Sequence, residues 1–367
     1  MSQRAKHAAC AGWLFIALAG GGPVMAQSSS SKAHPEYSVE KRTTEGYATY
    51  HLHDAPRKME LSIVPSLGLF AYQFKVNGKD VFIPTESFRS YVATHWFGWG
   101  NPFLAPWANR IDQDYFFVEG KKYLLNESLG NILRVPPKNY ILHGLLVYEP
   151  RWEIVKTGAS KATGAFLVAR LDFYKYPDLM ANFPFAHAYE VTYRLKDGKL
   201  ECRTAVANLG RSRMPAHFGY HPYFRPDGPR QEWTVGIGAR KHWLTERAVI
   251  PTGETEPTEK FLAGVTHGAA LRQTFIDDTF SDLERDASGL GSIWVKGKTQ
   301  KIEVVYSREY DYAVVYAPLD QTLICIEPET GPTNAFNLAH EGKFNGLIMV
   351  DPGKVIEASY WIIPTGY

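Results

Sequence analysis

The stretch that decides the fold is residues 191–206, with the sequence VTYRLKDGKLECRTAV. Apolar and polar residues alternate on both sides of Asp197-Gly198, as expected for two strands that each bury one face. The Asp-Gly dipeptide suits the positive φ angles that a tight two-residue hairpin loop requires. The stretch therefore predicts an antiparallel β-hairpin with its turn at residues 197–198.

The same period-two pattern recurs along the chain. Phe70, Tyr72 and Phe74 alternate with more polar neighbours and are followed by an Asn-Gly turn. Further strand candidates are residues 165–173, 301–307, 312–317, 323–327 and 355–363. Only residues 277–285 suggest a helix, of one or two turns, with Asp277-Asp278 as its N-cap. The 31 glycines and 23 prolines are scattered rather than gathered at a boundary, which predicts one large all-β domain.

The N-terminus has the pattern of a secretory signal. Arg4 and Lys6 precede an apolar run at residues 8–19, and residues 24–26 (VMA) resemble a small-residue cleavage site. The run is shorter than the roughly 20 residues of a membrane-spanning helix, although a single N-terminal anchor helix is the alternative. We therefore expect a periplasmic or secreted protein. Its predicted parts are a signal peptide at residues 1–26, a disordered leader at 27–35 and a single folded domain at 36–367.

Charge and cysteine content narrow the possible partners. Removal of residues 1–26 takes away two basic residues, so the 40 Lys and Arg fall to 38, equal to the 38 Asp and Glu. A formally neutral chain argues against a nucleic-acid or membrane-surface partner. Cys202 and Cys325 remain, and either a disulfide or two buried thiols is compatible with their sequence context.

Residues 323–337, LICIEPETGPTNAFN, place Glu327 at the end of an apolar, β-prone segment. Strand-end carboxylates beside rigid loops often serve as general bases in β-rich enzymes, although an ordinary strand followed by a polar turn has the same pattern. Residues 219–224, GYHPYF, offer His221 as a proton donor in a similarly stiff setting. Pro328 predicts that the strand ends there, so Glu329 is interpreted as a structural or supporting residue.

Residues 96–111 contain three tryptophans among glycines and prolines, and they end on Asn109-Arg110-Ile111. Trp107 and its neighbours would form a platform for the C–H faces of a sugar, and Arg110 offers five hydrogen-bond donors in a fixed fork. The alternative is a tryptophan-rich core with a surface arginine. His143, before a glycine, is by itself compatible with a purely structural role.

The sequence gives no reason to expect a metal or nucleotide. His217 and His221 stand four residues apart, but Gly219 and Pro222 disfavour the helix that would make them joint ligands. Phosphate-binding glycine motifs and the GxSxG motif of serine hydrolases are absent from the sequence.

Taken in order, the motifs above resemble those of the aldose 1-epimerase (galactose mutarotase) family. The matching segments are Asn109-Arg110-Ile111 with the following run at 117–126, Leu142-His143-Gly144, His221-Pro222-Tyr223-Phe224, Ile326-Glu327-Pro328 and residues 334–337. The resemblance implies a large antiparallel β-supersandwich with few short helices, and reversible interconversion of the α and β anomers of a free aldohexose.

The resemblance also implies roles for individual residues. Glu327 would be the general base on the anomeric hydroxyl, and His221 the general acid at the ring oxygen. The sugar would be bound by Arg110, His143, Asn109 and Trp107, with Asp278 as a further hydroxyl ligand. The implied partner is a monosaccharide, with no cofactor and no metal, and the oligomeric state stays open.

Three departures from the best-known mutarotases fall in or beside the expected pocket, and they are Leu145, Tyr220 and Arg225. They leave open which sugar is bound and whether the protein catalyses its conversion. Two other functions are therefore retained at this stage. One is a non-catalytic carbohydrate-binding protein of the same fold, and the other is a carbohydrate-cleaving glycosidase or lyase, which would normally need two opposed carboxylates.

Overall fold

The computed structural model describes residues 35–95, 98–135, 139–246 and 249–367. Residues Pro35–Tyr367 form one compact unit, and the expected signal peptide and most of the leader lie outside the described residues. The all-β prediction is confirmed, because β-strands dominate and the α-helices are short. The predicted helical turns at 277–285 are wrong. This segment forms strand β23 (Ile276–Leu283), whose pairing with a strand on each side outweighs the local helix signal.

The largest sheet has nine strands and is antiparallel throughout. In spatial order its strands are β12 (Glu153–Ser160), β13 (Gly164–Leu171), β14 (His187–Lys196), β15 (Lys199–Asn208), β29 (Val355–Thr365), β25 (Lys301–Tyr306), β24 (Gly291–Lys296), β19 (Thr234–Ile237) and β22 (Ala269–Ala270). Strands β14 and β15 are the predicted hairpin. Its turn places Asp197 and Gly198 at φ angles of 51° and 79°, as expected for an Asp-Gly loop.

An eight-stranded sheet carries most of the candidate catalytic residues. Its order is β21 (Ile250–Pro257), β20 (Ala239–Glu246), β23, β26 (Tyr312–Ala317), β27 (Ile324–Glu329), β17 (Gly219–Tyr220) and β6 (Phe103–Leu104), with β18 (Tyr223–Phe224) also paired to β27. A five-stranded sheet contains β1 (Tyr37–Thr44), β2 (Tyr47–Asp54), β3 (Met59–Val64), β4 (Phe70–Val76) and β5 (Lys79–Asp80).

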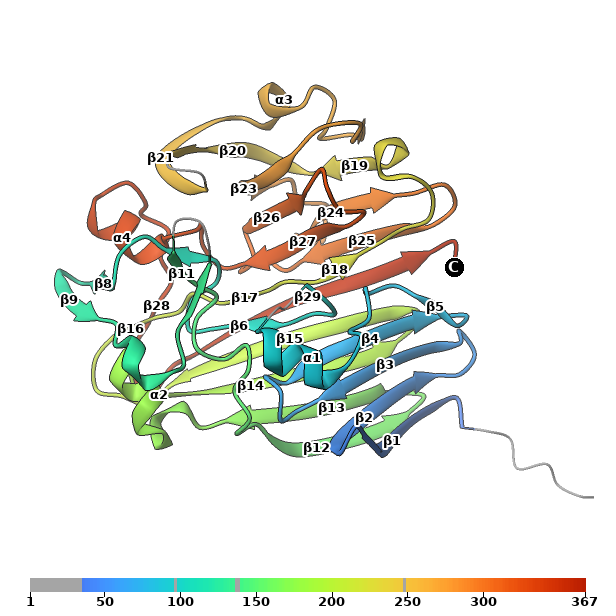
Figure 1. The fold of residues 1–367 in the computed structure, drawn as a ribbon, viewed down its shortest axis with the longest axis horizontal. Helices are drawn as coiled ribbons and strands as arrows, with labels where there is room; N and C mark the ends of the chain where they lie inside the picture. The colour runs from blue at the N-terminus through green and yellow to red at the C-terminus, as the bar shows by residue number, and fades with distance from the viewer. Residues whose placement is uncertain (1–34, 96–97, 136–138, 247–248) are drawn as a thin grey trace, which may run out of the picture. The chain divides into compact units, whose positions relative to one another are not determined.

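Both of these sheets pack on the nine-stranded sheet. Figure 1 shows β1–β5 in blue alongside the green strands β12–β14, and β1, β2 and β3 contact these strands. The eight-stranded sheet is held through aromatic contacts, such as the rings of Tyr220 and Tyr360, whose centroids lie 4.9 Å apart. The Tyr220 hydroxyl also lies 2.7 Å from that of Thr204 on β15. This arrangement of one long sheet covered by two shorter ones buries a single continuous core.

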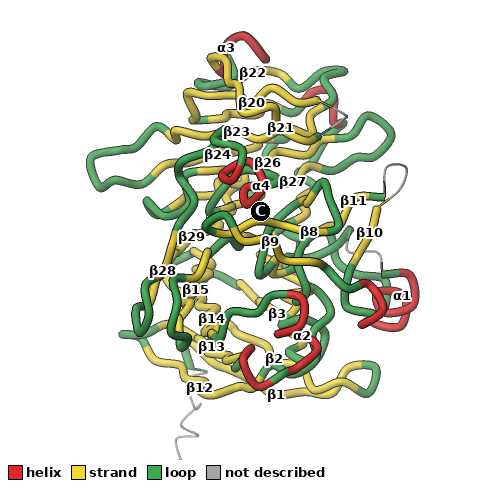
Figure 2. The backbone as a smooth tube through the Cα atoms, turned by 90° about the vertical axis from the view of Figure 1, so that its left-hand side faces the viewer, coloured by secondary structure: helices red, strands yellow, loops and turns green. Residues whose placement is uncertain are grey.

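Smaller elements complete the fold. A three-stranded sheet contains β10 (Leu133–Val135), β11 (Tyr140–Leu142) and β7 (Arg110–Ile111), and two further pairs are β8 (Tyr115–Val118) with β9 (Lys121–Leu124) and β16 (Met214–Pro215) with β28 (Met349–Val350). The helices of the described residues are α1 (Phe88–Thr94), α2 (Pro177–Asn182), α3 (Thr258–Phe261) and α4 (Ala335–His340), with 3₁₀ turns at Glu127–Leu129, Phe173–Lys175 and Arg230–Glu232. Ala335 and Leu338 of helix α4 share a buried cluster with Trp243 of β20, and Tyr312 of β26 packs against that cluster. Figure 2 shows α4 as a short red helix near β26. None of the helices described is long and apolar enough to cross a membrane.

Strand β27 continues through Pro328 to Glu329, so the prediction that the proline ends it is wrong. Pro328 pairs with Ala313 of β26, while β17 and β18 pair only with the two ends of β27. The Thr330 N–H donates to Phe218 O on the β17 side, and alternate backbone nitrogens of a strand point to the same side. The Pro328 nitrogen therefore faces the gap between β17 and β18, where a missing N–H costs no ladder hydrogen bond.

Candidate active site

The candidate site is built on one face of β27. Because side chains alternate along a strand, Cys325, Glu327 and Glu329 project to the same face. Glu327 is 1% exposed and Glu329 is fully buried. One oxygen of Glu327, Oε2, is buried without a hydrogen-bond partner among the described residues. Two carboxyl groups on one buried face are costly to ionise, and such an arrangement is typical of functional sites.

His221 reaches this face from the segment between β17 and β18. Its Nε2 lies 3.3 Å from Oε1 of Glu327, and its ring stacks on Tyr223 with centroids 4.5 Å apart. The backbone N–H of His221 donates to Pro102 O, which fixes the start of the side chain. Gly219 lets β17 pack closely against β27, because a Cβ atom at this position would lie 2.6 Å from Pro328 O. The two predicted proton-transfer residues are thus brought together.

Asn109 and His143 hold each other in place. The His143 N–H donates to Asn109 O at 2.8 Å, and the Asn109 N–H donates to Nδ1 of His143 at 3.2 Å. Since Nδ1 accepts a hydrogen bond, a neutral His143 carries its proton on Nε2 and can donate it to a ligand. Both residues have positive φ angles, 55° and 58°, which the reciprocal bonds stabilise.

The rings of His143 and His221 meet edge to face, with centroids 5.1 Å apart. Gly144, which follows, has a φ of 72° and packs so tightly that a Cβ atom would lie 2.1 Å from Ala105 O. The Leu-His-Gly motif is therefore explained by backbone geometry as well as by the imidazole.

Arg110 lies between Asn109 on one side and Asp277 on the other. Its Nη1 donates to Asn109 Oδ1 at 2.8 Å, and its Nη2 lies 3.5 Å from Oδ2 of Asp277. The Arg110 side chain is 19% exposed and that of Asp277 is 14% exposed, so this cation borders the buried carboxylates while retaining some access to solvent. A guanidinium with free donors in this position can bind sugar hydroxyls.

The structure brings Asp277, rather than Asp278, into this cluster. The register pairs Asp277 with Tyr316 of β26, which in turn pairs with Cys325, on the face that carries Glu327. Asp278 projects to the opposite face, where Oδ1 lies 3.0 Å from Nε2 of His242. Sequence reasoning chose between two adjacent aspartates, and only the strand register separates them.

Burial dominates the electrostatics of the cluster. It lowers the pKa of His221 to about 3, and it raises the pKa of Glu327 well above the ordinary glutamate value. The charges of Glu329 and Asp277 raise the pKa of Glu327 further, while Arg110 opposes them. Burial raises the pKa of Glu329 to about 8, although the polar side chain of Asn109 and the Arg110 charge lower it. The site therefore favours the uncharged forms of His221 and of its carboxyl groups.

Burial also favours the uncharged forms of His143 and Asp277. Burial lowers the pKa of His143 well below its ordinary value, and His221 and Arg110 add to the effect, so this imidazole is neutral. Burial raises the pKa of Asp277, and Arg110 opposes that rise. The charge of Arg110 thus lowers the pKa of three carboxyl groups, those of Glu327, Glu329 and Asp277, and burial raises the pKa of all three.

Other predicted residues lie elsewhere. Trp107 is fully buried in the main core and packs near Phe116, so it is not an exposed platform, and Trp96 lies outside the described residues. Of the three departures, Tyr220 points toward the nine-stranded sheet, Arg225 is exposed and donates to Thr322 O, and Leu145 follows the His143 segment. Cys202 and Cys325 are separate, buried thiols.

The segment after β27 fixes the backbone of Arg110 through a hydrogen bond. The Asn334 N–H donates to Arg110 O at 2.9 Å, and Asn337 Nδ2 donates to Asp112 Oδ1 at 2.9 Å. The motif at 334–337 therefore supports the site through the backbone. Sequence reasoning did not assign this role, and the pair of asparagines at helix α4 was the available signal. No group of three or more potential metal ligands occurs in the part of the chain that the structure describes.

Comparison with known proteins identifies the fold and the family. A family model described as aldose 1-epimerase matches residues 61–362. A curated relative, the uncharacterized protein YihR of Escherichia coli strain K12, is 26% identical over 258 residues, which cover 68% of this chain and 74% of that protein.

Solved structures agree in fold. A galactose mutarotase-like protein from Clostridium acetobutylicum superposes with a TM-score of 0.78 at 21% identity, covering 90% of this chain and 99% of the other. The galactose 1-epimerase of Lactobacillus acidophilus NCFM has a TM-score of 0.68 at 13% identity, with the same two coverages. The predicted galactose mutarotase-like architecture is therefore confirmed.

Proposed function

The chain belongs to the aldose 1-epimerase family, and from that premise we propose that it interconverts the α and β anomers of a free aldohexose. The observation that carries the proposal is the 3.3 Å approach of His221 Nε2 to Glu327 Oε1 in a buried cluster beside Arg110. Ring opening of a hemiacetal takes one proton from O1 and delivers one to O5, and closure reverses both transfers. Because O1 and O5 are bonded to the same carbon, the acid and the base must lie close together, as these two side chains do.

In the proposed mechanism, Glu327 removes the proton from the anomeric hydroxyl and His221 protonates the ring oxygen. The C1–O5 bond then breaks, and the free aldehyde is formed. Rotation about C1–C2 exposes the other face of the carbonyl, and the reverse transfers close the ring as the opposite anomer. Positioned proton transfer of this kind typically contributes about 10²–10⁴-fold. No covalent intermediate and no cofactor enters the proposal.

The charge state of the pair fits this cycle. The reaction needs one proton between His221 and Glu327, and a neutral imidazole beside a carboxylic acid holds the same number as an imidazolium beside a carboxylate. Burial favours the neutral arrangement in the free protein. A bound sugar brings hydroxyl groups that can hydrogen-bond to the ionic arrangement and make it accessible.

The remaining residues of the cluster would bind the sugar. Arg110 and the Nε2–H of His143 would serve as donors, and Asp277 is an acceptor on the same face. Asn109 would act mainly by fixing His143 and Arg110. We further propose that the protein acts after export, in the periplasm or outside the cell, on a neutral monosaccharide.

The test is polarimetry on freshly dissolved α-D-glucose and α-D-galactose with the purified protein. We expect the approach to the equilibrium rotation to accelerate in proportion to protein concentration. Calorimetry on the same sugars tests the alternative function. Saturable sugar binding, with mutarotation no faster than the spontaneous rate, would identify a non-catalytic binding protein. A spontaneous rate across a panel of aldoses would refute the proposed activity.

A further inference from the structure

The ring of Tyr223 lies on the imidazole of His221, the proposed general acid. The two ring centroids are 4.5 Å apart and the ring planes differ by 7°, which is the geometry of an aromatic stack. Both side chains are buried, with 4% of Tyr223 and 6% of His221 exposed. This face of the imidazole therefore meets an aromatic ring rather than water.

The backbone fixes both members of the stack. The His221 N–H donates to Pro102 O at 3.1 Å. The Tyr223 N–H donates to Gly100 O at 2.9 Å, and Tyr223 O accepts a hydrogen bond from the Ile83 N–H at 2.9 Å. The Tyr223 ring also belongs to a buried apolar cluster of its own. The two rings are therefore held in place before any sugar binds.

The Tyr223 hydroxyl lies over the imidazole rather than beside it. Its oxygen is 3.4 Å from Nε2 of His221. Because a phenol oxygen lies in the plane of its own ring and the two planes are nearly parallel, this contact is made to the face of the imidazole and not along the in-plane lone pair of Nε2. Burial raises the pKa of Tyr223 well above its ordinary value, and Cys325 and Glu327 raise it further, so the hydroxyl keeps its proton.

A stacked aromatic ring favours the charged form of an imidazole. The face of a tyrosine ring attracts a cation within about 6 Å of its centroid, and the attraction is larger where water is excluded. Burial lowers the pKa of His221 to about 3, so the imidazolium that the proposed reaction requires is costly to form. The attraction to Tyr223 is made only when His221 carries the proton, so it assists the chemical step rather than sugar binding.

We infer that Tyr223 is a positioning residue whose aromatic face stabilises the imidazolium form of His221 while the sugar ring opens and closes. The inference rests on the proposed function and adds a third side chain to the acid–base pair. The shared proton moves between Glu327, the sugar and His221, whereas Tyr223 neither gains nor loses a proton.

The experiment measures kcat and KM by polarimetry on the aldose that the wild-type protein converts fastest. Tyr223→Phe keeps the aromatic face, and we expect its kcat to stay within about threefold of wild type. Tyr223→Leu removes that face, and we expect kcat to fall about 10–30-fold while KM stays within twofold, because the lost interaction is absent from the ground state. Tyr223→Met, which fills the space with a flexible apolar chain, should lose as much as Tyr223→Leu.

Phe224→Leu is the matched control. Phe224 is the next residue of β18, and its fully buried ring packs on Phe82, with centroids 5.9 Å apart, rather than on His221. We expect its kcat to remain within threefold of wild type. Circular dichroism and thermal unfolding establish that each variant is folded at the assay temperature.

The outcomes separate the role of Tyr223 from the proposed activity. An active wild type with equal kcat values for Tyr223→Leu and Phe224→Leu would overturn the inference and leave the activity intact. A loss in Tyr223→Phe as large as that in Tyr223→Leu would also overturn it, because the hydroxyl and not the aromatic face would then be responsible. A raised KM with unchanged kcat would overturn it in favour of sugar binding. A wild type that leaves the spontaneous rate unchanged for every aldose would refute the proposed function and this role together.

Discussion

Two of the histidine–glutamate pairs among the described residues, His221 with Glu327 and His51 with Glu60, place the same side chains in opposite electrostatic environments. In the candidate site, Nε2 of His221 lies 3.3 Å from Glu327, whose side chain is 1% exposed. On the five-stranded sheet, Nδ1 of His51 lies 2.9 Å from Glu60, whose side chain is 33% exposed. The histidine is buried in both pairs, so the difference lies in the surroundings of the carboxylate.

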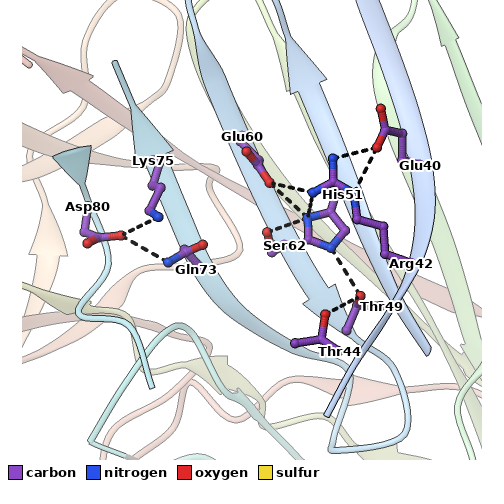
Figure 3. A network of polar contacts seen from close by, with 10 residues as sticks. All are labelled: Glu40, Arg42, Thr44, Thr49, His51, Glu60, Ser62, Gln73, Lys75 and Asp80. Atoms are coloured by element: carbon purple, nitrogen blue, oxygen red, sulfur yellow. Dashed lines mark hydrogen bonds and ion pairs between the residues drawn. The ribbon is translucent and has the colours of Figure 1, made fainter. Parts of the chain in front are cut away.

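The second pair belongs to a polar network on the outer face of β1–β5 (Figure 3). His51 also contacts Thr49 and Ser62, and Nη1 of Arg42 lies 3.8 Å from Glu60. A hydrogen bond from His51 lowers the pKa of Glu60, although burial opposes it. This carboxylate is therefore stabilised in its charged form, whereas Glu327 is driven toward its neutral form.

The comparison shows that the contact distance alone does not distinguish a catalytic pair from a structural one. A carboxylate with a neighbouring cation and access to water keeps its charge and has no proton to exchange near neutral pH. A carboxyl group desolvated beside a second carboxyl group keeps a proton that a substrate can exchange. The pair on β27 is the one suited to proton transfer.

The largest effect should come from breaking the buried pair. Glu327→Gln removes the proposed base, and we expect kcat/KM for mutarotation to fall by about 10³-fold, with a comparable loss for His221→Asn. Polarimetry measures the rate, and circular dichroism checks that both variants fold. Glu60→Gln is the matched control and should stay within twofold of wild type. A fully active Glu327→Gln variant would remove Glu327 from the mechanism.

The two adjacent aspartates of β23 provide a smaller, sharper test. Asp277→Asn removes the negative charge beside Arg110 and replaces one acceptor oxygen with an NH2 donor, and we expect kcat/KM to fall about 10–100-fold, mainly through KM. Asp278→Asn alters the contact with His242 on the other face and the hydrogen bond that Asp278 Oδ2 accepts from the Asp277 N–H, but no side chain of the cluster, so activity should remain within threefold. Equal losses in the two variants would contradict the assignment by strand register.

Local sequence patterns predicted the all-β class and several of its strands, whereas the supersandwich architecture was implied by the resemblance to a family. Alternation and the Asp-Gly turn predicted the β14–β15 hairpin, because both signals act over a few residues. The meeting of residues 109, 143, 221 and 327 was reached only through resemblance to a family, since no local pattern encodes contacts between such distant segments. Pro328 misled because its effect depends on which side of the strand is unpaired, and that is a property of the assembled sheet.

Glu329 tests why the buried pair keeps its proton. Glu329→Gln removes a negative charge that raises the pKa of Glu327, so the base should ionise more readily. The proposed reaction needs the proton that the pair shares, and ionisation of Glu327 beside a neutral His221 removes it, so activity falls as pH rises through the pKa of Glu327. We therefore expect the basic limb of the kcat/KM profile to move to lower pH by about 1 pH unit. An unshifted profile would show that the two carboxyl groups titrate independently.

The same variant should change stability in a pH-dependent way. In the folded protein burial raises the pKa of Glu329 from 4.5 to about 8, so between these values the folded state holds a proton that the unfolded state has released. Unfolding free energy must then fall as pH rises across this range. Glu329→Gln should therefore stabilise the protein at pH 8 and have little effect at pH 4, as measured by denaturant titration.

The smallest expected effect is that of Glu60→Gln on stability, and its pH dependence should have the opposite sign. The folded-state pKa of Glu60 is lowered, so its contribution is present above the ordinary value of 4.5 and is lost as pH falls through the folded-state value. For a partly exposed pair we expect a loss of about 0.5 kcal/mol at pH 7 that disappears near pH 3. Denaturant titrations of this variant and of Glu329→Gln at the same pH values compare the two pairs directly. A Glu60→Gln deficit that persists undiminished at pH 3 would mean that packing, rather than charge, holds the outer network together.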